Sequence, residues 1–182
     1  MTIKTEYTAI APHGGELVDR RAPADEREER KRQAEGFTKV ALGPRTLSDL
    51  EMISTGVFSP ISGFMVREDY ESVVNNMRLA NGLPWTIPVT LSIPESDARQ
   101  FHLDQEVTLT YRGKPLATMT ITDIFPRDKQ REASNVYGTT EATHPGVAAV
   151  YDAGDICIGG PILLIALTMS LAAFTASMVT RS

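Results

Sequence analysis

The 182-residue sequence contains very little of several residues on which common functions depend. It has one cysteine, Cys157, which cannot form an internal disulfide or build a zinc site by itself. The three histidines, His13, His102 and His144, stand far apart and show neither the H-x-x-H nor the H-E-x-x-H spacing. We therefore predict no metal site and no oxidising compartment, and we expect a cytoplasmic protein. His13 and His144 precede glycine or proline, which is typical of turn residues.

Positive charge is also scarce. Lysine and arginine total 18 against 23 aspartates and glutamates, which gives a formal net charge of -5 and a pI near 5.2. This balance argues against a protein that binds nucleic acid or an anionic membrane surface, so we expect no nucleic-acid partner. The first 20 residues lack the apolar core and cleavage pattern of a signal peptide. The remaining composition, 42% hydrophobic and 23% charged, is that of a globular chain with one ordinary core.

The residues alone identify no catalytic or cofactor-binding site. No G-x-S-x-G motif is present, and Cys157 lies in an alternating apolar run, where a small buried residue is the better interpretation than a nucleophile. Residues 154–161, GDICIGGP, space two glycines as a phosphate-binding loop does, but Gly160 and Pro161 stand where lysine and a hydroxyl residue are needed. Candidate carboxylates are Asp97, Asp104, Asp123 and Asp128, and the sequence does not say which of them meet.

Helical patterns occur in five places. The clearest places Tyr70, Val73, Val74 and Met77 at helical spacing. The predicted helices span residues 23–36, 46–55 (with Thr46 as its cap), 67–80, 128–137 and 145–153. The basic residues Arg127, Lys129 and Arg131 alternate with Asp128 and Glu132, which predicts a solvated helix start.

The middle of the chain alternates with the period of a strand. In residues 106–111 and 117–122, apolar residues alternate with threonines, which predicts two half-buried strands. Arg112-Gly113 between them predicts a hairpin, and residues 86–93 predict an edge strand because they contain Pro88. Since no regular strand–helix–strand alternation is present, we predict an α+β fold with a mostly antiparallel sheet or a partly closed barrel.

Several long stretches together resemble the amino-terminal part of the ATP sulfurylases, which are sulfate adenylyltransferases. They are PHGGELVDR at 12–20, LSDLEMISTGVFSPISGFM at 47–65, EDYESVVNNMRLANGLPWTIPVTL at 68–91, NVYGTTEATHPGV at 135–147 and GDICIGGPI at 154–162. The resemblance covers nearly the whole chain up to about Ile165. It implies a PUA-like pseudo-barrel of mostly antiparallel strands with flanking helices over residues 1–165.

That family transfers the adenylyl group of ATP to sulfate, giving adenosine 5'-phosphosulfate and pyrophosphate, on a following nucleotidyltransferase domain. The motifs expected there, of the types Q-x-R-N-P-x-H-x-x-H-E and G-R-D-H, do not occur in these 182 residues. The resemblance therefore supplies no catalytic, cofactor-binding or metal-binding residue, and we expect an amino-terminal domain that is inactive alone. Alternatives are a PUA-like RNA-binding module, and a docking or regulatory subunit of a split or full-length ATP sulfurylase.

Two groups of matching residues have two interpretations each: they either determine loops and core, or form a surface that docks on the catalytic domain or on another subunit. The first group is Phe58, Pro60, Gly63 and Phe64, and the second is Tyr137, Gly138, His144, Pro145 and Gly146. Exposed apolar surface near them predicts self-association or docking to a homologue.

The carboxy-terminal segment, residues 166–182, does not resemble the family, and no charged residue occurs between Asp155 and Arg181. A truncated or frameshifted gene product, a fragment whose partner is a separate chain, and a membrane anchor are three explanations of it. The part after Ile165 is too short to cross a bilayer as a helix. We therefore predict a soluble protein whose tail is poorly ordered or aggregation-prone.

Overall fold

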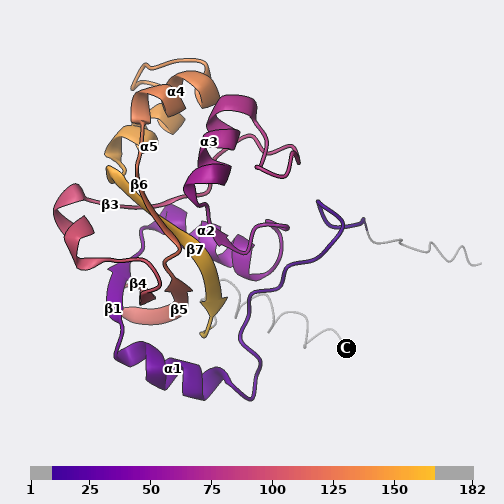
Figure 1. Cartoon of the computed structure of the whole chain (residues 1–182), viewed down its shortest axis with the longest axis vertical. Coiled ribbons are helices and arrows are strands. Elements are labelled where there is room, and N and C mark those ends of the chain that lie inside the picture. Colours follow the sequence, from indigo (N-terminus) through magenta and orange to yellow (C-terminus); the bar gives the residue numbers. More distant parts are fainter. Residues whose placement is uncertain (1–9, 167–182) are drawn as a thin grey trace, which may run out of the picture.

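The computed structural model describes residues 10–166, and within that range a curled seven-stranded sheet is flanked by helices (Figure 1). The helices are α1 (Arg27–Glu35), α2 (Pro44–Ser54), α3 (Arg67–Asn76), the short 3-10 helix η1 (Glu95–Gln100), α4 (Lys129–Tyr137) and α5 (Pro145–Asp152). The strands are β1 (Thr38–Ala41), β2 (Gly63–Phe64), β3 (Leu91–Ile93), β4 (Glu106–Tyr111), β5 (Lys114–Thr120), β6 (Asp123–Pro126) and β7 (Ile156–Leu164). The predicted α+β class with a mostly antiparallel sheet is confirmed.

Strand β7 organises the sheet because four other strands pair with it, all antiparallel. Its first half, from Ile156, pairs with β3 and β6, and its second half, up to Leu164, pairs with β2 and β5. The halves meet at Gly159 and Gly160. A Cβ at Gly159 would strike the backbone oxygen of Met65, and one at Gly160, whose φ is +151°, would strike that of Thr120. These glycines therefore allow close approach of the neighbouring backbone, and most of the segment that resembled a phosphate loop forms the first part of β7.

The predicted hairpin is confirmed between β4 and β5, with Arg112 and Gly113 both at positive φ. Beyond β4 lies β1, which pairs with it in parallel, Thr38 opposite Val107. Neither β1 nor β6 was predicted from the sequence. Each is four residues long, too short for period-two alternation to stand out.

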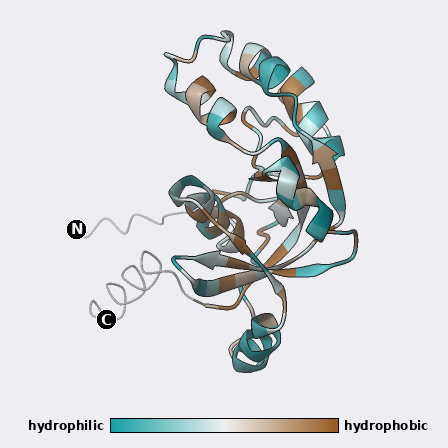
Figure 2. Cartoon of the chain, turned by 90° about the vertical axis from the view of Figure 1, so that its left-hand side faces the viewer, coloured by the Kyte–Doolittle hydropathy of each residue, from teal (hydrophilic) through white to brown (hydrophobic). Residues whose placement is uncertain are grey.

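The prediction that β4 and β5 are half-buried is wrong. Thr108, Thr110 and Thr118 are buried, although threonine alternation had placed them on a solvent face. The reason is α1, which packs beneath the sheet and exposes a hydrophilic outer side (Figure 2). The Thr108 hydroxyl donates a hydrogen bond of 2.6 Å to the carbonyl oxygen of Ala34 in α1, so its burial leaves no unpaired polar group.

Two helix boundaries differ from the prediction for local reasons. Helix α2 begins at Pro44, with Gly43 rather than Thr46 as its cap, because proline is favourable at the first helical position. Helix α3 ends at Asn76 because Met77 adopts a left-handed conformation (φ 54°), so the predicted end at residue 80 is wrong.

The main core lies between the sheet and helices α2 to α4. Its largest buried side chains include Tyr70, Phe64, Phe125, Leu50 and Ile53. No helix among residues 10–166 is long and apolar enough to cross a membrane. Apart from Ala166, the predicted carboxy-terminal segment 166–182 lies outside the described residues.

Candidate functional site

A cleft of about 680 Å³ lies between α2, the segment of residues 84–92 and the helices α4 and α5. Its walls therefore come from four parts of the chain that are distant in sequence. Two further lining residues, Phe58 in the loop after α2 and Tyr137 in α4, belong to the groups for which the sequence left a choice between packing and docking. The cleft combines aromatic, apolar and charged side chains in one concave surface.

Aromatic rings line one side of the cleft around Trp85. Phe58 meets the Trp85 ring edge-on, with centroids 5.6 Å apart, and His13 lies tilted at 6.1 Å. The Trp85 indole nitrogen donates to the carbonyl oxygen of Ile87 (2.9 Å), and Nε2 of His13 donates to that of Pro84 (3.0 Å). These bonds hold the ring edges while leaving ring faces for apolar contact. His13 itself lies in a turn, as its neighbours predicted.

Asp49 lines the same cleft from α2. It is half-buried, and its carboxylate makes no hydrogen bond and no ion pair within residues 10–166. Burial raises the pKa of Asp49 from 3.8 to about 6, and the charge of Arg45, one helical turn earlier, opposes that shift only in part. Withdrawal of a carboxylate from water is unfavourable without a partner, so Asp49 is available to a donor that enters the cleft. Sequence analysis missed it because Asp49 carries no motif.

A buried ion pair forms part of another wall. Nε of Arg127 donates to Oε2 of Glu132 (2.7 Å), and Nη2 donates to Oε1 (2.6 Å), while the hydroxyl of Tyr70 donates to Oε2 (3.0 Å). Burial alone would lower the pKa of Arg127, but the hydrogen bonds and charge of Glu132 raise it. For Tyr70, burial and the charge of Glu132 both raise the pKa. The predicted solvated helix start is wrong here, because the Arg127 and Glu132 side chains are only 8% and 2% exposed.

The turn before α5 is confirmed as a packed structure. Nδ1 of His144 accepts a hydrogen bond from the backbone of Gly146 (3.2 Å), and its ring lies 5.2 Å from that of Tyr137. A Cβ at Gly146 would strike the Tyr137 ring, so glycine is needed there. Gly138 ends α4 in the left-handed conformation, with a φ of 68°. This group therefore positions Tyr137, which lines the cleft.

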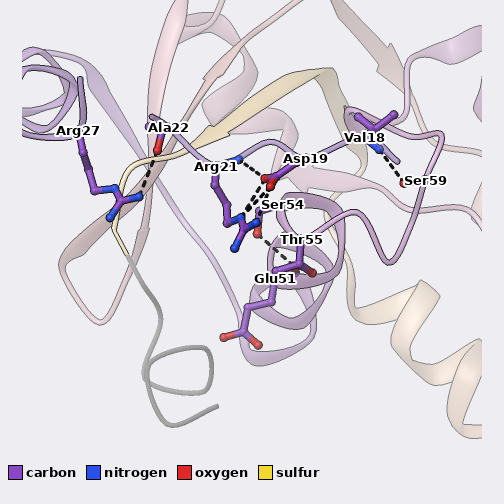
Figure 3. A network of polar contacts seen from close by, with 9 residues as sticks. All are labelled: Val18, Asp19, Arg21, Ala22, Arg27, Glu51, Ser54, Thr55 and Ser59. Carbon is purple, nitrogen blue, oxygen red and sulfur yellow. Dashed lines mark hydrogen bonds and ion pairs between the residues drawn. The ribbon is translucent and has the colours of Figure 1, made fainter. Parts of the chain in front are cut away.

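The segment of residues 18–22 is hydrogen-bonded to the loop after α2 (Figure 3). Ser59 accepts a hydrogen bond from the backbone nitrogen of Val18 (2.9 Å) and donates one to the carbonyl oxygen of Gly56 (2.6 Å). The Arg21 guanidinium pairs with Asp19 in the same segment. The loop is thereby held while Val57 stays 67% exposed at the cleft.

The four aspartates singled out in the sequence serve separate local roles. Asp128 caps α4 by accepting from the backbone of Arg131 (3.0 Å), and Asp123 accepts from the backbone of Arg67 (2.8 Å). Asp97 pairs with the hydroxyl of Ser96, and Asp104 occupies a turn with φ 63°. No group of three metal-ligating side chains occurs in the part of the chain that the structure describes.

Cys157 is fully buried in β7, and burial raises the pKa of its thiol to about 12. A thiol with that pKa is almost wholly protonated at neutral pH. It is held away from solvent among the side chains of the core. The interpretation of Cys157 as a small buried residue is therefore confirmed.

Comparison with known proteins shows the family to which this chain belongs. Residues 10–167 match the family of PUA-like domains. The sulfate adenylyltransferase of Synechococcus elongatus is 49% identical over 157 residues, which are 86% of this chain and 40% of that protein. That of a Synechocystis species is 45% identical over 162 residues, 88% of this chain and 42% of that protein. The chain thus spans about two fifths of the length of these relatives.

Among solved structures, a hexameric APS kinase from Thiobacillus denitrificans has a similar fold. The TM-score is 0.67 with 24% sequence identity, over 88% of this chain and 27% of the other. At that identity the likeness concerns the fold alone.

Proposed function

Because this chain belongs to the family of PUA-like domains, we propose that it is the PUA-like part of a sulfate adenylyltransferase. In this proposal the transfer of an adenylyl group from ATP to sulfate requires the part of the enzyme that this chain does not match. The main support is the 49% identity with a sulfate adenylyltransferase, which extends over 86% of this chain but only 40% of the relative.

The side chains that line the cleft fit a binding or docking role better than a catalytic one. Binding a triphosphate and stabilising a transferring phosphoryl group needs several unpaired cationic groups or backbone donors aimed at one point. Of the two arginines that line the cleft, Arg127 is engaged by Glu132. Arg45 is exposed at the start of α2 and shares the cleft with the carboxylate of Asp49.

We further propose that the cleft and its rim dock on the remaining part of the enzyme. Val57 is 67% exposed and Ile87 is 52% exposed, and both line the cleft. Exposed apolar side chains next to a concave aromatic surface are typical of an interaction site. When the remaining part is absent, the same surface favours association of this chain with itself or with a full-length homologue.

We also propose a cytoplasmic location and a domain boundary near Ile165. A cytoplasmic location agrees with a single buried cysteine that needs no oxidising environment. We propose that the domain ends near Ile165, a buried residue whose backbone nitrogen donates to the carbonyl oxygen of Leu116 (2.8 Å), and that residues 166–182 are a separate segment.

A pyrophosphate-release assay on the purified chain with ATP and sulfate tests the dependence on the remaining part. We expect no sulfate-dependent turnover above the background without enzyme. Folding of the sample is verified by circular dichroism, so that an inactive preparation is not a denatured one. Sulfate-dependent turnover by this chain alone would overturn the proposal.

A further inference from the structure

We infer that the cleft receives a basic side chain of the docked polypeptide and that Asp49 is its partner. The inference rests on the proposed function, since the polypeptide in question is the part of the sulfate adenylyltransferases that this chain does not match. The inference adds the chemistry of the contact. The group that meets Asp49 is a guanidinium or ammonium group, on a basic residue that has apolar neighbours in its own sequence.

The first support is the unpaired carboxylate. Asp49 is half-buried in the wall of the cleft, yet no donor among residues 10–166 reaches its oxygens within hydrogen-bonding distance. A half-buried negative charge without a partner is unfavourable in the isolated chain. A cation entering the cleft removes that disadvantage. The raised pKa of Asp49 agrees with this, since burial disfavours the charged carboxylate and Arg45 offsets that effect only in part.

The second support is that the other charged groups of the cleft are unsuitable as its partner. The titratable residues that line the cleft besides Asp49 are His13, Arg45, Arg127, Glu132 and Tyr137. Arg127 and Glu132 satisfy each other, and His13 is held by the carbonyl oxygen of Pro84. Arg45 lies four residues before Asp49 on α2, the less favourable order for an ion pair along a helix, and no such pair forms.

The third support is the setting of Asp49, which fits a cation attached to a polypeptide. The rings of Trp85 and Phe58 line the same cleft, and aromatic faces attract guanidinium and ammonium groups. The exposed side chains of Val57 and Ile87 offer apolar contact beside it. A small free cation would leave those side chains uncovered, whereas a basic residue with apolar neighbours would cover them.

Trp85 is the single tryptophan of the chain, so its fluorescence reports on the cleft without labelling. The probes are the blocked tripeptides acetyl-Leu-Arg-Leu-amide and acetyl-Leu-citrulline-Leu-amide, which have nearly the same shape but differ in charge. At about pH 8, where Asp49 is ionised, we expect the arginine peptide to bind about five-fold more tightly. At about pH 5, where Asp49 is mostly protonated, the preference should fall toward one.

Two variants separate Asp49 from its surroundings. Asp49→Asn should abolish the preference for the arginine peptide while keeping the circular dichroism spectrum, and Arg45→Gln, on the same helix face of the cleft, should retain it. Equal affinity for both peptides, no saturable binding of either, or an unchanged preference in Asp49→Asn would overturn the inference. Binding of acetyl-arginine-amide as tight as that of the tripeptide would also overturn it, in favour of a small-cation site. None of these outcomes touches the proposed function, which the pyrophosphate assay tests separately.

Discussion

Arg127 and Glu132 form a two-point ion pair in the interior, joined by the hydroxyl of Tyr70. The pair links the end of β6 to α4, while Tyr70 brings in α3. Three elements that meet beside the cleft are thus held by one carboxylate. Removing one partner of such a pair leaves the other charge buried without compensation, which is more harmful than the pair itself is favourable.

We therefore predict that Glu132→Gln lowers the free energy of unfolding by about 3–5 kcal/mol. Urea denaturation followed by circular dichroism measures the change. The matched control is Lys31→Ala, which removes the exposed Lys31–Glu28 pair of α1 and should leave the urea midpoint close to that of the unmodified chain. Similar small losses in both variants would show that the interior pair is solvated after all.

Asp49 should make the stability depend on pH. Its pKa is about 6 in the folded chain against 3.8 ordinarily, so the folded state binds the proton more tightly. The stabilisation is complete below about pH 3.8 and is lost as pH rises through about 6. Asp49→Asn should accordingly stabilise the chain by about 1–3 kcal/mol at pH 8 and by little at pH 4. Urea midpoints at both pH values test this, with the exposed Asp25→Asn as a control. A destabilised Asp49→Asn at pH 8 would mean that the carboxylate has a stabilising partner.

Cys157 offers a probe of global opening, because it is the only thiol. With a pKa of about 12 and full burial, it should react with an aromatic disulfide reagent at pH 8 at least about a thousand-fold more slowly than in denaturant. Absorbance of the released thiolate measures both rates. Fast labelling without denaturant would contradict the burial of β7.

Gly63 tests the close contact between β2 and β7. A Cβ there would strike the backbone oxygen of Gly160, so Gly63→Ala should lower the free energy of unfolding by about 3 kcal/mol or more. Gly36→Ala is the control, since Gly36 has helical dihedrals and its nearest neighbour would be an ordinary 3.6 Å away. That change should be neutral or stabilising by about 0.4–1 kcal/mol. Thermal unfolding of both variants measures the difference. Equal thermal stability of the two variants would contradict the close contact between β2 and β7.

Local patterns in the sequence predicted the main helices and the β4–β5 hairpin, but not β7, the longest strand. The alternation in residues 106–111 predicted β4 with its observed bounds, and Arg112-Gly113 predicted the hairpin. The same alternation was misleading about burial, since Thr108 faces α1 and not solvent. Which helix covers which face of a sheet depends on contacts between distant residues, and a periodic pattern does not contain that information.

The cleft shows the same limit for function. Its walls come from α2, residues 84–92, α4 and α5, which are distant in sequence, and neither Asp49 nor Trp85 lies in a spacing that marks a site. The charge alternation around Arg127 and Glu132 is the usual pattern of a solvated helix, yet Tyr70, which is 62 residues before Glu132, donates to its carboxylate in the interior. Only the long resemblance to ATP sulfurylases, over five stretches between residues 12 and 162, indicated a function.

We propose that this chain supplies the PUA-like part of a sulfate adenylyltransferase and depends on the rest of that enzyme for activity. The most direct measurement is sulfate-dependent pyrophosphate release after co-expression of this chain with the Synechococcus elongatus enzyme from which the matching 40% has been removed. We expect a purified complex of the two chains with turnover that neither chain shows alone, and loss of that turnover when this chain is omitted. Equal turnover of the shortened enzyme with and without this chain, or turnover by this chain alone, would contradict the account.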